Sequence, residues 1–342
     1  NGSGATYVAY VFAHDDQLFG TNSDESIIKC GSYTGNGNTE GPTIDLGFEP
    51  QFVFLRCTTR PGSHGGGWYL FNHMQGINTG STDKTVQAQE ANAEASSSNA
   101  DIALTPTGFQ ATGTGVHSNA SGGTYIYMAI RRPNKPPEAA TEVFAIGRQG
   151  EVNSGSLPSY HSNFVVDMHF TKDVTSSNDN FNGARLLGEK YLTTNSTAAV
   201  TSQSWYDYDY MDGWGDSTNV NTNFYSYMFK RAPGFMDVVA YTGTGSATTI
   251  NHNLEVVPEM MWIKNRDDNE SWSVYHKDKG ADKTMWLNDS GAGITSDRFN
   301  NTAPTDSVFS VKTDNAVNSN GDDYIAYLFA TLPGISKVGS YT

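Results

Sequence analysis

The sequence predicts an all-β protein made of tandem antiparallel β-sandwich repeats, each of about 100 residues. The 342 residues include 35 Gly, 18 Tyr and 17 Phe but few Leu, Lys and Glu, a composition that favours strands and turns over helices. Clusters of Gly, Asn, Ser and Asp interrupt the apolar segments roughly every 8–12 residues, as in a sandwich. Similar segments also recur at intervals of about 100 residues, which indicates an internal repeat.

The overall charge and hydropathy argue against two classes of partner. The formal net charge is −15 and Lys and Arg do not cluster, so we expect no binding to nucleic acid. No run approaches the roughly 20 apolar residues that a transmembrane helix needs, so we expect no membrane insertion. The 12% of aromatic residues supply enough burial for a folded core, although only 37% of the chain is hydrophobic.

A tyrosine-rich apolar segment is the clearest repeated element, and we expect it to be the last strand of each unit. Tyr127, Tyr227 and Tyr327 are spaced by 100 residues, which sets the period of the repeat. The segment occurs four times, at residues 4–12, 122–128, 224–229 and 323–329.

Other segments repeat with the same period. A strand of the Ser-Tyr-Thr type opens a unit and occurs at residues 29–37, 239–245 and 337–342. A strand entered by proline follows, at 50–56 and 258–264, and its successive apolar residues predict burial on both faces. A Trp-led strand (68–71 and 272–275) and a Lys-led segment (84–86, 190–192 and 283–287) come next.

These repeats divide the chain into three complete units: unit 1 (29–133), unit 2 (134–234), which is the most divergent, and unit 3 (235–333). Residues 1–28 would hold the last strand of a preceding repeat plus a linker, and 334–342 the first strand of a following one. We therefore expect the chain to be a section of a longer protein. A lone strand leaves its backbone groups unpaired, so we expect residues 6–12 to pair with a sheet of this chain or of a neighbouring one.

Short joints that contain proline separate the units, at residues 132–137, 232–234 and 332–334. Such joints are stiffer than Gly/Ser linkers, so neighbouring units should keep a restricted orientation.

Two local features leave alternatives open. Residues 84–95 carry a weak helical spacing, but the equivalent segment of unit 3 resembles a strand, and a loop also fits. Cys30 and Cys57 could face each other across adjacent strands and form a disulfide, or they could be buried free thiols.

The sharpest candidate for a site is the acidic and aromatic segment from residue 205 to residue 216. Closely spaced carboxylates beside a Gly turn can hold Ca²⁺, and aromatic neighbours can stack on sugar rings. The third hypothesis is a Tyr-rich strand followed by a turn, with its acids facing water. The candidate binding residues for a glycan or Ca²⁺ are Trp205, Asp207, Tyr208, Asp209, Asp212, Trp214 and Asp216.

The motifs of catalysis are missing from the sequence. It contains no Gly-x-Ser-x-Gly elbow, no phosphate-binding loop and no His-x-x-x-His pair. We therefore expect no catalytic residue, no enzyme activity and no cofactor other than the possible Ca²⁺.

Several long motifs carry a resemblance to a known group of proteins. They read NASGGTYIYMAIRRP at 119–133, KRAPG at 230–234 leading into 241–245, NHNL at 251–254 with VPEMMW at 257–262, and FNNTAPTDSVF at 299–309. At these motifs the chain resembles the repeat-bearing virion structural and tail-fibre-like proteins of marine tailed bacteriophages. The resemblance implies jelly-roll, concanavalin-like sandwiches and carries over no catalytic residue.

We therefore expect a structural or adhesive component of a phage particle, forming a rod or knob of a tail fibre, spike or capsid appendage on the virion surface. Its expected partners are other copies of itself, in a homotrimer by analogy, other virion proteins and host-surface glycans. The alternatives are a glycan-degrading enzyme on a fibre, and a non-viral extracellular lectin or filament subunit. A cleft with two carboxylates about 5–10 Å apart would favour the enzyme.

Overall fold

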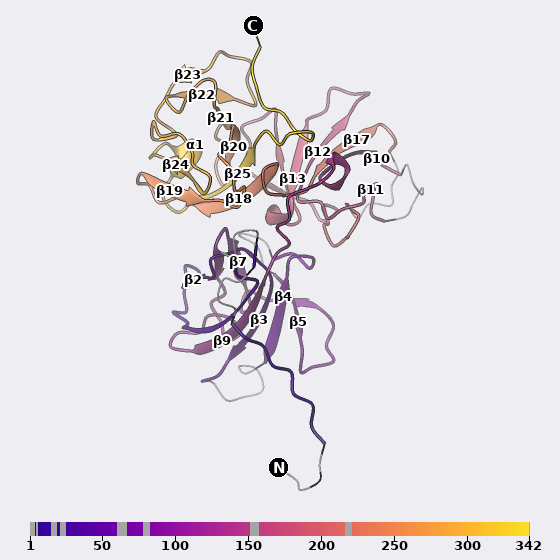
Figure 1. Ribbon diagram of the computed structural model, residues 1–342, viewed down its shortest axis with the longest axis vertical. Helices are drawn as coiled ribbons and strands as arrows, with labels where there is room; N and C mark the ends of the chain where they lie inside the picture. Colours follow the sequence, from indigo (N-terminus) through magenta and orange to yellow (C-terminus); the bar gives the residue numbers. More distant parts are fainter. Residues whose placement is uncertain are drawn as a thin grey trace.

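Three six-stranded antiparallel sheets, each accompanied by a smaller sheet, make up the fold (Figure 1). The computed structural model describes residues 4, 6–14, 19–20, 25–59, 67–77, 83–150, 157–215 and 221–341. Strands form about 38% of the chain and helices about 3%, so the predicted all-β sandwich class is confirmed. No helix in these residues is long and apolar enough to cross a membrane.

Unit 1 contributes nine strands in its described residues. The large sheet has the order β1-β9-β3-β4-β5-β6 and the small sheet the order β2-β8-β7. The strands are β1 (Ile28–Thr34), β2 (Thr43–Asp45), β3 (Pro50–Cys57), β4 (Trp68–Asn72), β5 (Lys84–Gln87), β6 (Ala95–Ser96), β7 (Ile102–Thr105), β8 (Gly108–Ala111) and β9 (Thr124–Arg131).

Unit 2 repeats this topology in the order β10-β17-β12-β13-β14-β15, with β11 and β16 paired in the small sheet. Its elements are η1 (Ala140–Glu142), β10 (Phe144–Arg148), β11 (Tyr160–His161), β12 (Met168–Asp173), β13 (Phe181–Ala184), η2 (Arg185–Leu187), β14 (Lys190–Thr193), β15 (Thr201–Ser202), β16 (Gly213–Trp214) and β17 (Phe224–Phe229).

Unit 3 has the order β18-β25-β20-β21-β22-β23, with β19 and β24 paired in the small sheet. Its elements are β18 (Met236–Thr242), β19 (Thr248–Asn251), β20 (Met260–Asn265), β21 (Ser273–His276), β22 (Lys283–Trp286), β23 (Ile294–Thr295), β24 (Val308–Val311), α1 (Asn315–Asn318) and β25 (Asp323–Phe329). In all three large sheets the first strand of the unit pairs with its last strand, and the Lys-led strand lies fifth.

Paired tyrosines explain why the repeated segments are rich in this residue. Tyr33 faces Tyr125 across β1 and β9, and Tyr241 faces Tyr324 across β18 and β25. The two pairs stack with ring centroids 5.0 and 5.1 Å apart. Their buried hydroxyls donate to backbone carbonyls: Tyr33 to Ser118 and Tyr241 to Val317. A buried hydroxyl needs such a partner, so these tyrosines tie the preceding loop to the sheet.

The register corrects one alignment drawn from the sequence. The sequence spacing aligned Tyr127 with Tyr327. In the sheets, however, Tyr125 and Tyr324 hold the same position, so Tyr127 is equivalent to Ala326 and Tyr327 is equivalent to Met128. A slip of one residue turns a side chain to the opposite face of a sheet. Tyr127 accordingly packs on Phe109 inside its own unit, with ring centroids 5.6 Å apart, whereas the Tyr327 hydroxyl donates to Asn182 of unit 2.

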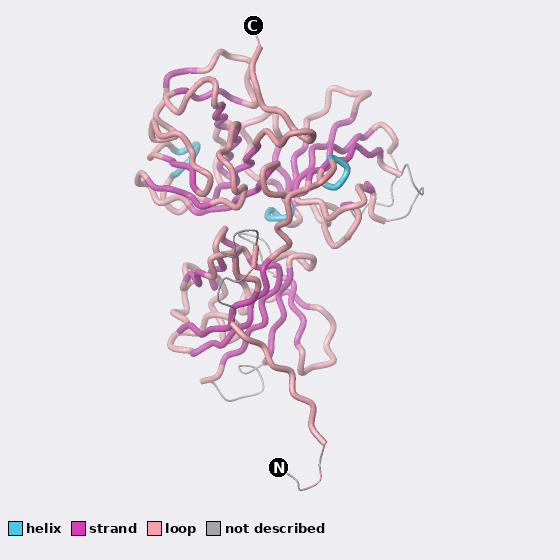
Figure 2. The backbone as a smooth tube through the Cα atoms, in the orientation of Figure 1, coloured by secondary structure: helices cyan, strands magenta, loops and turns pink. Residues whose placement is uncertain are grey.

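Three expectations about local structure are settled by the strands. Residues 84–95 are not helical: β5 and a turn lead into β6. Cys30 and Cys57 are free, because β9 separates β1 from β3 and keeps the two thiols two strands apart. Residues 6–14 form no strand with this chain and their side chains are exposed, so the predicted pairing within the chain is wrong. Figure 2 shows this segment as a loop that leads away from unit 1. Residues 336–341 also lie outside the strands.

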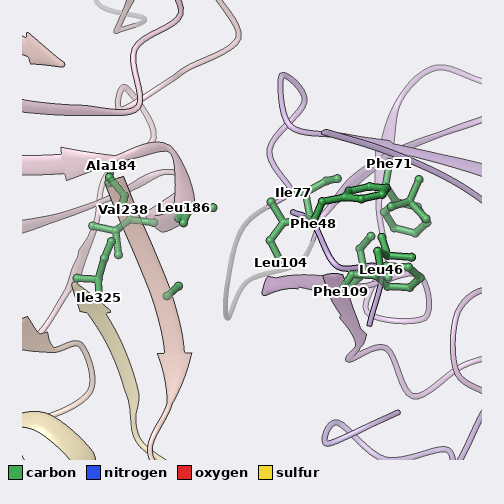
Figure 3. Packing of buried hydrophobic residues seen from close by; sticks show 14 of the residues in the cluster. Leu46, Phe48, Phe71, Ile77, Leu104, Phe109, Ala184, Leu186, Val238 and Ile325 are labelled. Atoms are coloured by element: carbon green, nitrogen blue, oxygen red, sulfur yellow. The ribbon is translucent and has the colours of Figure 1, made fainter. Parts of the chain in front are cut away.

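Units 2 and 3 pack sheet against sheet, beside unit 1 (Figure 1). Between them Ala184 and Leu186 of unit 2 lie against Val238 and Ile325 of unit 3 (Figure 3). Figure 3 also shows the core of unit 1, built from Leu46, Phe48, Phe71, Ile77, Leu104 and Phe109. The packing covers only part of the two sheets, since Ile146 of β10 and Ile294 of β23 remain 57% and 47% exposed.

Candidate functional site

The aromatic residues of the predicted site lie in the core of unit 2. Trp214 is fully buried in β16 and stacks on His169, with ring centroids 3.4 Å apart. Its indole nitrogen donates to Ser226 Oγ at 2.9 Å. Tyr208 is 5% exposed, and Arg185 lies over its ring, 5.4 Å from the centroid. Trp214 therefore offers no ring face to solvent, and Tyr208 keeps only a small part of its surface accessible, at the lining of a cleft.

Trp205 is the one aromatic residue of the predicted set that is half-buried rather than buried. It packs on Tyr206, with ring centroids 4.5 Å apart. Tyr206 itself is 1% exposed. Trp205 therefore covers the core and keeps only part of its surface in solvent.

The acidic residues of the predicted site are separated by the fold. Asp207 and Asp209 line a cleft of about 530 Å³ between unit 1 and unit 2. Asp212 is exposed and lies outside that lining, with its carboxylate 3.4 Å from His161 Nδ1. Asp216 lies outside the described residues. Among the described residues of the predicted cluster, the cleft thus brings together one pair of carboxylates.

Lys84 of unit 1 supplies the opposing charge in this cleft. Its ammonium lies 3.9 Å from Asp209, 3.9 Å from Glu189 and 3.8 Å from Glu94. Partial burial would lower the pKa of Lys84, but Asp209, Asp207 and the two glutamates raise it, so the lysine stays charged. Burial, followed by the Asp207 carboxylate, raises the pKa of Asp209 to about 6.

No cation-binding set of ligands accompanies this pair. Among the residues that the structure describes, no group of three or more His, Cys, Asp or Glu side chains could hold a metal ion. One Asp207 oxygen accepts the backbone N–H of Asp209 at 2.9 Å, and Lys84 already sits among the remaining carboxylates. The arrangement is that of an ion-paired polar cleft, a different chemistry from an oxygen-lined Ca²⁺ site.

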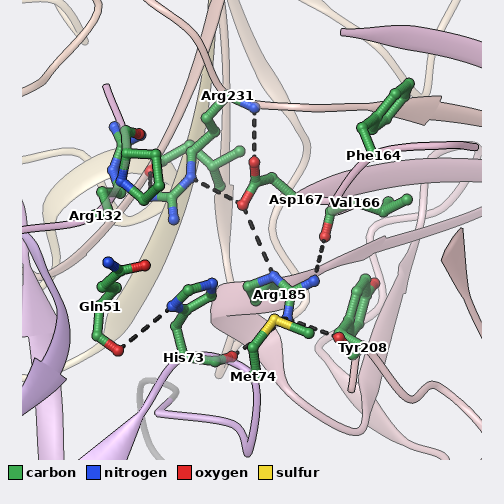
Figure 4. Close-up of polar contacts among 12 residues, drawn as sticks. Gln51, His73, Met74, Arg132, Phe164, Val166, Asp167, Arg185, Tyr208 and Arg231 are labelled. Atoms are coloured by element: carbon green, nitrogen blue, oxygen red, sulfur yellow. Dashed lines mark hydrogen bonds and ion pairs between the residues drawn. The ribbon is translucent and has the colours of Figure 1, made fainter. Parts of the chain in front are cut away.

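Arg185 forms the floor of the cleft and joins unit 1 to unit 2. Its guanidinium donates to the backbone carbonyls of Tyr208 at 2.8 Å, Val166 at 2.9 Å and His73 at 3.2 Å (Figure 4). Burial and the nearby Arg185 charge lower the pKa of His73 to about 4, so this imidazole is neutral at pH 7.

A buried ionic junction lies behind this floor and involves all three units. Arg132 and Arg231, which occupy the same position after the last strand of their units, supply the positive charges. Arg231 Nη1 lies 2.7 Å from Glu49 of unit 1 and its Nε 3.3 Å from Asp167 of unit 2. Arg132 lies 3.6 Å from Glu49 and 3.3 Å from Asp237 of unit 3.

The charges of this junction are shielded from water. All five residues are at most 9% exposed. Burial would raise the pKa of Asp167, but Arg231 and Arg185 outweigh it and hold that pKa below its usual range. Burial would likewise lower the pKa of Arg231, yet Glu49, Asp167 and Asp237 raise it. Breaking one partner of such a network leaves a buried charge uncompensated.

A second cleft, of about 740 Å³, separates unit 1 from unit 3. Threonines dominate its walls, with Thr105 and Thr107 on one side and Thr249 and Asn251 on the other. Asn253 of unit 3 crosses its edge, and its side-chain amide donates to the Pro106 carbonyl at 2.9 Å. Both clefts are thus polar and lie between units.

Sequence reasoning missed Lys84, Arg185, His73 and the junction. The two arginines do leave a signal, since each occurs one or two residues before the proline of a joint. The pairing of Lys84 with Asp209 leaves none, because packing between units brings together residues 125 positions apart.

Comparison with known proteins gives one family. The model described as "Domain of unknown function (DUF7483)" matches residues 1–133 and 162–342, which is most of the chain. No curated protein and no solved structure matches the chain significantly.

Proposed function

We propose a structural and adhesive role for this chain, which belongs to the DUF7483 family. The proposed role is that of a component of a phage particle, in a tail fibre, spike or capsid appendage at the virion surface. It would assemble with copies of itself and other virion proteins and contact host-surface glycans. The long sequence motifs shared with tail-fibre-like proteins suggest this assignment, and the construction of the three units supports it.

The buried junction is the observation that carries the proposal. An appendage must transmit force between a particle and a surface without its domains separating. Glu49, Asp167 and Asp237 each come from a different unit: Glu49 contacts both arginines, Asp167 contacts Arg231 and Asp237 contacts Arg132. This network, together with the sheet packing of units 2 and 3, favours a rigid knob over a flexible row of beads.

Adhesion would use the polar clefts, one of which holds Asp207 and Asp209 of the predicted segment, and not the buried ring of Trp214. Carboxylate, amide and hydroxyl groups line both clefts and can hydrogen-bond sugar hydroxyls. The virion assignment and the glycan contact are tested by two separate experiments.

The first experiment asks where the protein is. Purified, salt-washed particles of the phage that encodes the chain are digested and analysed by mass spectrometry, and intact particles are labelled with antibodies against residues 25–341. We expect its peptides at a fixed copy number and labels on an appendage. Peptides confined to the unassembled fraction would overturn the virion assignment.

The second experiment asks whether the clefts bind sugar. The purified protein is applied to an array of host polysaccharides beside Lys84→Met and Thr249→Val variants, one for each cleft. Loss of binding in one variant, with unchanged melting, would assign the cleft. Equal binding by both variants would overturn the use of these clefts.

One observation favours the enzyme alternative as a second candidate. Asp209, with its pKa of about 6, and Asp207 stand together in one cleft, and a pair of carboxylates with different protonation is what glycoside hydrolysis uses. If the cleft degrades glycans, Asp209→Asn abolishes release of reducing sugar without changing melting. Against it stands Lys84, which already neutralises Asp209. Absence of sugar release by the unmodified protein would end this candidate.

A further inference from the structure

The two clefts differ in what their polar side chains are bound to. In the cleft between units 1 and 2, the charged groups already bind protein: Lys84 is ion-paired with Asp209, and Arg185 donates to three backbone carbonyls. In the cleft between units 1 and 3, several side-chain hydroxyls and one amide make no hydrogen bond to any described residue. They belong to Thr39, Thr43, Thr107, Thr249 and Asn251.

Strands from two units supply the walls of this second cleft. Side chains alternate between the two faces of a strand, so Thr43 in β2 is exposed while its neighbour Ile44 is buried. In β19 the same alternation exposes Thr249 and Asn251. The cleft therefore presents hydroxyl and amide groups, which can both donate and accept hydrogen bonds.

Small apolar surfaces lie among these polar groups, from Ala103, Pro106 and Ile250. A neutral sugar ring carries hydroxyls around its rim and C–H groups on its faces, so it suits a lining of this mixed kind. The cleft volume of about 740 Å³ also falls within the roughly 300–1,000 Å³ of ligand sites.

The charge of the cleft disfavours acidic sugars. Its described lining holds three carboxylates, from Glu40, Asp101 and Asp323, against the single guanidinium of Arg266. Arg266 is 2% exposed and lies 3.8 Å from Asp323, so its charge is already offset. A carboxylate or sulfate on a ligand would be repelled here and would lose its hydration without gaining a cation.

Two contacts between the units set the separation of the walls. Asn253 of unit 3 donates to the Pro106 carbonyl of unit 1 at 2.9 Å, and Arg132 of unit 1 lies 3.3 Å from Asp237 of unit 3. A cleft that is already formed before the ligand arrives loses less conformational entropy on binding.

We propose that the cleft between units 1 and 3 is the glycan-binding site of the chain, and that it binds neutral polysaccharides and rejects acidic ones. The inference rests on the glycan contact proposed above, to which it adds the site and the class of ligand. Thr43, Thr249 and Asn251 exchange hydrogen bonds with sugar hydroxyls, and the apolar surfaces cover the C–H faces of the rings. Because the ligand carries no charge, salt should change its affinity little.

An array of neutral polysaccharides and their carboxymethylated forms tests the class of ligand. Dextran, mannan, xylan and a β-glucan are printed beside the carboxymethylated form of each, and the full chain is applied at low and at raised salt. We expect binding to at least one neutral polysaccharide, and binding to its charged form that is at least about ten-fold weaker at low salt. Glu40→Lys should narrow that difference, because it replaces a carboxylate of the lining by an ammonium.

Threonines in strands supply matched variants for the site. Thr249→Val removes one hydroxyl at nearly constant volume and should weaken binding of the neutral polysaccharide about three- to ten-fold, as loss of a hydrogen bond does. The control is Thr201→Val, at an exposed threonine of β15 that lines neither cleft. Valine suits a strand, so both variants should melt like the unmodified chain. Should Thr249→Val melt early, Asn251→Ala on the same strand takes its place.

The outcomes separate this inference from the role on which it rests. Binding of acidic polysaccharides alone, equal binding by Thr249→Val and Thr201→Val, or binding that only Lys84→Met removes would each overturn the proposed site or ligand class while leaving the glycan contact standing. Absence of binding to every polysaccharide of the array would overturn both.

Discussion

Trp272 and Trp68 occupy the same position of the repeat, so their replacement by alanine measures what the packing of units 2 and 3 contributes. Trp272 is fully buried between the two units, stacks near Tyr327 and donates its indole N–H to the Thr193 carbonyl at 3.0 Å. Trp68 is half-buried, stacks on Phe54 and has the Arg56 guanidinium over its ring. The same chemical change is therefore made in a fully buried and in a half-buried site.

The expected magnitudes differ for the two variants. Truncating a buried Trp costs about 3–5 kcal/mol through lost burial and the remaining cavity. The Thr193 carbonyl also loses a donor, which costs about 1 kcal/mol more. Trp68→Ala removes a smaller buried area and should cost about 1–2 kcal/mol. Trp272→Ala should thus destabilise the fold by about 3 kcal/mol more than Trp68→Ala.

Urea unfolding measures both values, at concentrations low enough to keep the chain monomeric. Trp272→Ala should also separate the transition of unit 1 from that of units 2 and 3, because the interface of the latter is the part that weakens. Trp272→Phe serves as the conservative control and should recover most of the packing but not the hydrogen bond. Equal destabilisation by Trp272→Ala and Trp68→Ala would refute the contribution of Trp272 to the packing of units 2 and 3.

Three further predictions concern charge. Arg231→Met should lower the free energy of unfolding by about 3–5 kcal/mol in thermal unfolding, because it leaves Glu49 and Asp167 charged and buried. Adding Glu49→Gln and Asp167→Asn should recover much of that loss, and a loss below about 1 kcal/mol for Arg231→Met would contradict a stabilising role of the junction. Lowering the pH from about 6.5 to 4 should destabilise the protein by up to about 3 kcal/mol through His73, because His73 takes up a proton in the unfolded chain but stays neutral in the folded chain, where its pKa is about 4. His73→Asn should make the stability depend less on pH in a series of melting curves. Asp209→Asn should stabilise the fold at pH 8 and change nothing below the unfolded pKa of about 4, because the raised pKa of Asp209 makes the stability that this carboxyl contributes fall as the pH rises through about 6. Since the carboxylate is about one-third exposed, the gain in free energy of unfolding should stay under about 1 kcal/mol, and a loss at pH 8 would contradict the prediction.

Local sequence patterns were sufficient for the fold class and most of the repeat. The segment beginning at Pro50 and that beginning at Pro258 fall in the same strand of their sheets, and so do the three Lys-led segments. The spacing of 100 residues between tyrosines gave an alignment that was wrong by one residue, because Tyr127 and Tyr327 do not occupy equivalent positions in their sheets. A spacing carries no information on which face of the sheet a residue occupies once the units differ in length by one.

The candidate site was predicted only in part. The segment from residue 205 to residue 216 does hold two residues of a cleft, Asp207 and Asp209. The sugar-stacking hypothesis requires exposed aromatic residues, whereas Trp214 and Tyr208 pack inside unit 2 against His169 and Arg185. A run that mixes aromatic and acidic residues is compatible with burial or with exposure of its aromatic side chains, because burial depends on which neighbours the fold places beside them.

The sequence by itself determined the sandwich units, their order and their stiff joints, because these depend on alternation, turn residues and proline within a few residues of one another. Only the tertiary structure decided how the units meet. The contacts of Arg231 with Glu49, of Trp272 with Thr193 and of Phe170 with Trp262 each join residues about 80 or more positions apart. Such pairs form because burial of complementary faces stabilises one arrangement of the units, and no local pattern encodes which unit covers which face.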